Sequence, residues 1–202
     1  MPNKNNSNNF GKWFESSLQV LKSLNDNRKD QLHIGEVMAC WTYLAFVESI
    51  ISYEEIGLNM TTDQDVQKFI PDALKVANSH KQELRDFMLK EGVPLPSSPE
   101  HKPKADPKAV PEGTKLTDDE LMNTLSINFV YAGDMCAAAA SQCIRTDVGL
   151  MFLKFQVDKF SLGFSAKEIM RKRGWLKRPP AYNPPGAPNM QFNQSNKNQG
   201  SN

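Results

Sequence analysis

The chain has 202 residues, which is enough for one domain of ordinary size, and its mean hydropathy of −0.54 indicates that part of its length is solvated tail. Residues 31–175 carry 16 basic and 20 acidic side chains, whereas residues 176–202 carry three basic and no acidic ones. A net charge of −4 on the body matches a phosphate backbone poorly, so the charge pattern argues against a nucleic-acid-binding protein.

The start of the chain and its cysteines bear on the compartment. The polar sequence MPNKNNSNNF has no apolar stretch, and so is not a secretory signal. No run of about 18 apolar residues is present, so we expect cytoplasmic synthesis and no membrane span. The cysteines Cys40, Cys136 and Cys143 are odd in number and form no CxxC motif. They indicate a reducing compartment and argue against a disulfide scaffold or a zinc knuckle.

Both ends of the chain differ in composition from the body. Residues 1–30 read as a polar tail followed by a short amphipathic helix, in which Phe10, Phe14, Leu18, Leu21 and Leu24 recur at helical spacing. Residues 179–202 hold five prolines and then a segment rich in Asn and Gln, a composition typical of disorder.

The short helix from Phe10 to Leu24 carries an apolar face that a helix of this length cannot stabilise alone. We therefore expect the face to dock, either on its own bundle or on a neighbouring chain. The polar break at residues 25–30 lets the segment reach outward, which favours the neighbouring chain and predicts a homo-oligomer.

Four long helices are predicted between residues 31 and 178, over residues 33–58, 62–91, 118–144 and 147–173, by apolar positions three and four residues apart. Thr61 with Gln64 and Thr117 with Glu120 have the spacing of capping boxes. Gly174 is placed to end the last helix.

The connections between these helices predict the topology. The first and third connections are short, so each joins an antiparallel helical hairpin. The middle one, from Gly92 to Thr117, holds six prolines and can run the length of a bundle on its outside. Two hairpins joined by one long crossover predict an all-α, ferritin-like antiparallel four-helix bundle, with the N-terminal helix as an addition.

A ferritin-like bundle raises the question of a di-iron site, which needs a Glu on each of two helices and Glu-x-x-His on each of the other two. Glu48, His80 and Glu83 are the candidate metal ligands, but His80 and Glu83 have the reverse order. The second hairpin offers only Asp134 and Asp158 near its middle and has no histidine. The favoured interpretation is a buried hydrogen-bonded pair of His80 and Glu48, with no cofactor. A mononuclear site or a di-iron centre, holding iron or another divalent metal, is the alternative.

No catalytic residue is predicted from the sequence. Cys40 lies two helical turns from His33, too far for a hydrogen bond that would activate the thiol. Buried cysteine acting as a small hydrophobe is the favoured reading. Arg145 and Asp147 flank a tight turn, and we expect a local ion pair that fixes it.

Several stretches, taken together and in this order, resemble a known family. They are His33-Ile-Gly-Glu36 leading to Trp41 and Leu44, Gly92-Val-Pro-Leu-Pro96 with the Pro-rich strand to Asp106, Thr117-Asp-Asp-Glu120, Ser141-Gln-Cys-Ile-Arg-Thr-Asp147 with Phe152, and Gly174-Trp-Leu-Lys-Arg-Pro-Pro180. The set resembles the ferritin-like family called domain of unknown function 3231, found in Bacillus-type spore formers and often described as similar to spore coat protein F. The resemblance covers about residues 31–180.

The resemblance implies a four-helix fold and a sporulation context, and it assigns no catalytic residues. We therefore expect a non-enzymatic structural or assembly protein of the spore coat. Its expected partners are itself and other coat proteins. The alternative function is a metal-binding protein or oxidoreductase that uses Glu48, His80 and Glu83.

Overall fold

The computed structural model describes residue 16 and residues 30–182. These residues form four long α-helices and two short 3-10 helices, and no strand. The elements are α2 (Ile34–Leu58), α3 (Gln64–Lys90), η1 (Pro107–Ala109), η2 (Glu112–Thr114), α4 (Asp118–Gln142) and α5 (Thr146–Arg173). The predicted all-α class is confirmed. Residues 1–15, 17–29 and 183–202, which include most of the predicted N-terminal helix and the C-terminal tail, lie outside the described residues.

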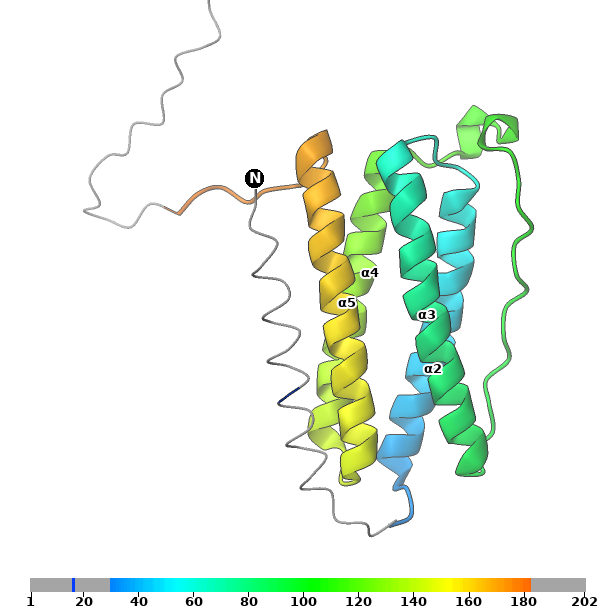
Figure 1. Cartoon of the computed structure of the whole chain (residues 1–202), viewed down its shortest axis with the longest axis vertical. Coiled ribbons are helices and arrows are strands. Elements are labelled where there is room, and N and C mark those ends of the chain that lie inside the picture. The colour runs from blue at the N-terminus through cyan, green and yellow to red at the C-terminus, as the bar shows by residue number, and fades with distance from the viewer. Residues whose placement is uncertain (1–15, 17–29, 183–202) are drawn as a thin grey trace, which may run out of the picture.

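The four helices form a bundle of two hairpins, α2 with α3 and α4 with α5 (Figure 1). Helix α2 also packs against α4, and α3 against α5, so each helix has antiparallel neighbours on both sides. The crossover between α3 and α4 returns along the outside of the bundle, as its prolines predict (Figure 1). The more specific prediction, that the bundle is ferritin-like, remains a prediction.

The crossover is attached to α2 by side chains from that helix and its C-cap. The Glu55 carboxylate accepts hydrogen bonds from the His101 ring and from the Lys102 backbone N–H, at 2.7 Å each. The Asn59 side-chain amide donates to the Pro103 carbonyl at 2.8 Å and accepts from the Ala105 backbone N–H at 2.9 Å. These bonds satisfy backbone groups that a Pro-rich strand cannot pair internally.

Helix ends follow the predicted caps with one correction. Thr117 and Glu120 form the predicted capping box. Helix α3 is capped by Asp63, not by the predicted Thr61, because the Asp63 carboxylate accepts from the Asp65 and Val66 backbone N–H groups. The Thr61 hydroxyl instead donates to Asp118 at 2.5 Å, which ties the α2–α3 turn to the start of α4. Gly174 ends α5 at a φ of 77°, where a side chain would be strained.

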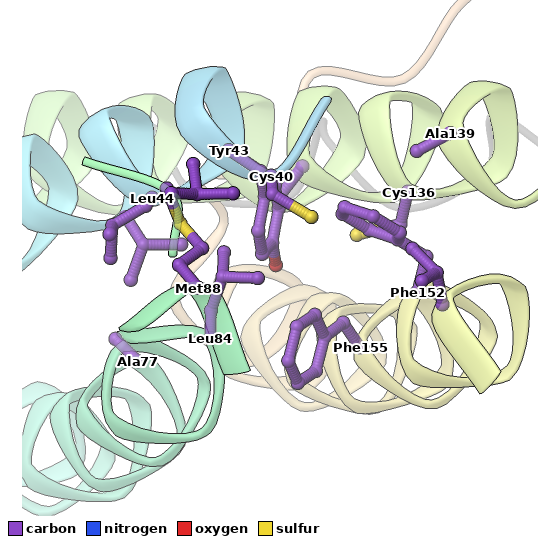
Figure 2. Packing of buried hydrophobic residues seen from close by; sticks show 14 of the residues in the cluster. Cys40, Tyr43, Leu44, Ala77, Leu84, Met88, Cys136, Ala139, Phe152 and Phe155 are labelled. Atoms are coloured by element: carbon purple, nitrogen blue, oxygen red, sulfur yellow. The ribbon is translucent and has the colours of Figure 1, made fainter. Parts of the chain in front are cut away.

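The core divides into two apolar clusters along the bundle axis. The first surrounds Tyr43, whose ring stacks on Phe155 at 5.6 Å and meets the edge of Phe152 at 5.7 Å (Figure 2). The second surrounds Phe129 and Phe69, whose ring centroids lie 5.9 Å apart. Trp41 lies outside both clusters and is 41% exposed.

Helix α2 is also long and apolar enough, by length and composition alone, to cross a membrane, with a mean hydropathy of 1.4 over 18 residues. A helix at the core of a bundle has the same composition. In this structure α2 packs on α3 and α4 and buries three glutamates, Glu36, Glu48 and Glu54. The absence of a membrane span therefore stays our expectation.

Candidate functional site

A histidine at the centre of the bundle links the core to the surface. Tyr43 of α2 lies with its hydroxyl 3.1 Å from Nδ1 of His80 on α3, and Nε2 of His80 lies 3.1 Å from Oδ2 of Asp158 on α5. The His80 ring also stacks on Phe155 at a centroid distance of 4.1 Å. The His80 side chain is 1% exposed, whereas that of Asp158 is 40% exposed. Three helices thus contribute one continuous chain of hydrogen bonds.

Which group donates in each hydrogen bond from Tyr43 through His80 to Asp158 follows from the chemistry of the two outer residues. An ionised Asp158 can only accept, so His80 donates from Nε2 and its Nδ1 accepts from the Tyr43 hydroxyl. Burial lowers the pKa of His80, against the opposing effect of its hydrogen bond to Asp158. Burial raises the pKa of Tyr43 well above its usual range. Both groups are therefore held neutral, which is the arrangement that costs least in an apolar core.

Two more ionisable residues lie deeper in the bundle, at the boundary between the two apolar clusters. Glu54 of α2 is fully buried and Lys159 of α5 is 1% exposed. Neither carboxylate oxygen of Glu54 has a hydrogen-bond partner among the described residues. Burial raises the pKa of Glu54 to about 7, although Lys159 opposes the rise. Burial likewise lowers the pKa of Lys159. Both pKa shifts favour the neutral forms of these two buried side chains.

Glu48 takes part in a different contact on the flank of the bundle. Its Oε1 accepts from the Ser98 hydroxyl of the crossover at 2.6 Å, and lies 3.5 Å from Arg85 Nη1. Lys81 Nζ is 3.7 Å from the same oxygen. Glu48 therefore joins α2, α3 and the crossover.

The structure separates the three predicted metal ligands. His80 bonds Tyr43 and Asp158, Glu48 bonds Ser98 and Arg85, and the Glu83 carboxylate accepts from Lys154 at 2.5 Å. The favoured interpretation, a direct His80–Glu48 hydrogen bond, is therefore wrong. Within residue 16 and residues 30–182, no group of three or more His, Cys, Asp or Glu side chains is placed to hold a metal ion. Metal binding at Glu48, His80 and Glu83 would require these side chains to leave their present partners.

The cysteines are placed as small hydrophobic groups. Cys40 and Cys136 are buried and Cys143 is half-buried. Burial raises the thiol pKa to about 12 for Cys40 and Cys136, and to about 11 for Cys143. Because the thiolate is the reactive form, these groups are poor nucleophiles at neutral pH.

Sequence reasoning missed Tyr43 and Asp158 as the partners of His80, and Glu54 and Lys159 as buried ionisable residues. A signal was available for two of them. Glu54 continues the apolar positions Val47 and Ile51, and Lys159 lies between the apolar positions Phe155 and Leu162. A charged residue at an inward-facing position of a helix is a candidate for a buried polar role.

The chain resembles known proteins over most of its length. Residues 22–187 match the family model described as "Protein of unknown function (DUF3231)". The uncharacterized protein YvdQ of Bacillus subtilis is 24% identical over 160 residues, which cover 79% of this chain and 94% of that protein.

A solved structure shares both the sequence pattern and the fold. It is described as the crystal structure of a putative spore coat protein from Bacillus halodurans, and is similar with a TM-score of 0.74 and 30% identity. The match covers 77% of this chain and 98% of that chain. The expected family is therefore confirmed: the chain belongs to the DUF3231 family.

Proposed function

We propose that this chain is a non-enzymatic structural or assembly protein of the bacterial spore coat. The observation that carries the proposal is the similarity to the Bacillus halodurans protein, which covers 98% of that protein and 77% of this chain. The family description assigns no activity.

The chemistry of the bundle supports a structural role. The His80 side chain is held neutral in the core, and the thiols of Cys40 and Cys136 are protonated. These groups therefore offer no activated base or nucleophile. Charged residues at the end of the bundle instead stabilise the α4–α5 turn. Arg145 forms the predicted ion pair with Asp147 and a further ion pair with Glu91, at 2.7 Å each.

Localisation during sporulation tests the proposal. A fluorescent fusion of the full chain, produced in a sporulating Bacillus strain, should move from the mother-cell cytoplasm to a ring or cap around the forespore. The fluorescent protein alone, produced in the same way, should stay diffuse. A fusion that stays diffuse until the mother cell lyses would overturn the proposal.

A second fusion tests whether the folded bundle is what assembles. Arg145→Ala removes both ion pairs at the α4–α5 turn, and so should weaken the ring in proportion to the loss of folded protein. Glu168→Ala changes an exposed residue of α5, and should localise like the unaltered chain. Equal rings with all three fusions would show that localisation does not depend on this end of the bundle.

A further inference from the structure

The outer side of α5 carries an apolar stripe that the four-helix core does not use. Leu150, Leu153, Val157, Phe160 and Phe164 follow one another at steps of three and four residues, on the side of the helix away from Phe155 and Lys159. Phe160 and Phe164 are exposed, and Leu153 and Val157 are half-buried. Leu150 is buried, yet it belongs to neither core cluster. A stripe of this spacing is typical of a helix that receives another helix.

The neighbouring side of α4 extends this apolar surface. The Phe160 ring packs on Gly133, where an added Cβ would lie 2.5 Å from the ring. Val130 and Ala137 lie on the same side of α4, three and four residues from Gly133. This apolar surface between α4 and α5, called the groove below, therefore combines the α5 stripe with Val130 and Ala137 of α4, and the Phe160 ring covers Gly133 within it.

We propose that the groove between α4 and α5, defined by these eight residues, receives the chain's own N-terminal segment, residues 10–24, as a fifth helix. Phe10, Phe14, Leu18, Leu21 and Leu24 give this segment an apolar face whose members also recur at steps of three and four residues. Ser16, the described residue within the segment, is helical. Phe10 to Leu24 and Leu150 to Phe164 each span 15 residues, so their first and last residues lie about 21 Å apart along a helix that rises about 1.5 Å per residue.

The position of Asp30 selects the chain's own segment as the occupant. The Asp30 carbonyl accepts from Arg145 Nη1 at 3.4 Å, so the N-terminal segment joins the bundle beside the start of α5. Five residues separate Leu24 from Asp30, and an extended chain spans up to about 3.3 Å per residue, so Leu24 can reach Leu150. The segment would then run antiparallel to α5, with Leu24 near Leu150 and Phe10 near Phe164.

The short connection to Asp30 also favours the chain's own segment over the same segment of a second copy. A segment joined by a few residues has an effective concentration of the order of millimolar at its own groove, which a second copy does not reach in dilute solution. We therefore propose docking on the chain's own bundle in place of the expected docking on a neighbouring chain, and the expected homo-oligomer would then use other surfaces.

Hydrogen exchange on the full chain, at several protein concentrations, tests the proposal. Backbone amides of residues 10–24 should exchange at least about tenfold more slowly than an unstructured segment, at concentrations where light scattering reports a monomer. Unprotected amides in this segment would overturn the proposal. Protection that grows with concentration alongside dimer formation would assign the groove to a second copy, and would overturn it as well.

Matched substitutions locate the docking site. Phe14→Glu and Phe164→Glu should each return the amides near Phe10 and Leu18 to the exchange of an unstructured segment, while α2 and α3 stay protected. Leu89→Glu is the control, because Leu89 on α3 is 60% exposed and Phe164 is 66% exposed. It should leave the N-terminal amides protected. Protection that survives Phe164→Glu, or that is lost equally with Leu89→Glu, would contradict docking in this groove.

Discussion

The side chain of Glu36 accepts a hydrogen bond from the backbone N–H of Arg145 at 2.8 Å, across 109 residues of sequence. The same oxygen accepts from the Ile144 backbone N–H, also at 2.8 Å, and the other oxygen closes the capping box of α2 at His33. Glu36 is buried, so one carboxylate at the start of α2 satisfies the backbone of the tight α4–α5 turn.

Glu36→Ala should therefore destabilise the bundle strongly. It leaves three backbone N–H groups without their acceptor, two of them in the α4–α5 turn, and each buried orphan donor costs about 1–3 kcal/mol. We expect the free energy of unfolding in urea to fall by about 3 kcal/mol or more, with a smaller fall for Glu36→Gln, which keeps one acceptor oxygen. Glu168→Ala, an exposed change, should shift stability by less than about 0.5 kcal/mol. Equal stabilities for the two alanine variants would show that the turn does not depend on Glu36.

Glu54 should make stability depend on pH. Burial raises its folded pKa to about 7, whereas in the unfolded chain it ionises near its ordinary value of 4.5. Between these values the unfolded state binds fewer protons, so the contribution of Glu54 is fully present below pH 4.5 and is lost as the pH rises to about 7. The loss is on the order of 3 kcal/mol at about 1.4 kcal/mol per pKa unit.

The measurement compares urea unfolding of the unaltered chain and of Glu54→Gln at pH 5 and pH 8. The unaltered chain should lose stability relative to the variant as the pH rises. The groups that titrate elsewhere, His80 among them, affect both proteins and cancel in the difference. Lys159→Met measures how much of the effect passes through the neighbouring ammonium. A stability difference between the unaltered chain and Glu54→Gln that is the same at both pH values would show that Glu54 does not titrate in this range.

The thiols should react slowly with a thiol reagent such as DTNB. With a pKa of about 12 for Cys40 and Cys136, and about 11 for Cys143, only a minute fraction of each is thiolate at pH 8. Cys143 should react first because it is half-buried, and Cys143→Ser should remove most of the labelling seen in the native protein. All three should react quickly in urea. Rapid labelling of Cys40 or Cys136 in the folded chain would mean that the core opens far more often than its packing predicts.

Iron binding should be weak. Glu48 is held by Ser98 and Arg85, and His80 by Tyr43 and Asp158, so a metal would have to displace these partners. Protein purified from iron-supplied cells should hold fewer than about one iron per two chains, since a di-iron site needs ligands from both hairpins. Elemental analysis of the unaltered chain and of Glu48→Ala checks this. A stoichiometric pair of irons that is lost in the variant would instead support the oxidoreductase alternative.

The amino-acid sequence by itself determined the helices and their order. Apolar spacing, the capping box of Thr117 and Glu120, and Gly174 are local features, and local backbone preferences follow from them directly. The prolines of the crossover likewise determined how the two hairpins are connected. A Pro-rich segment is extended and does not become part of a helix, so it can run the length of the bundle.

Only the tertiary structure decided which polar residues meet. Whether His80 faces Glu48 or Tyr43 and Asp158 depends on how far each helix is rotated about its axis, and packing of whole helix faces sets that rotation. The same holds for Glu36 and Arg145, which the fold brings together across 109 residues of sequence. Apolar periodicity tolerates a rotation of a few tens of degrees, whereas a hydrogen bond of about 3 Å does not. The sequence could therefore predict the bundle but not its buried polar contacts.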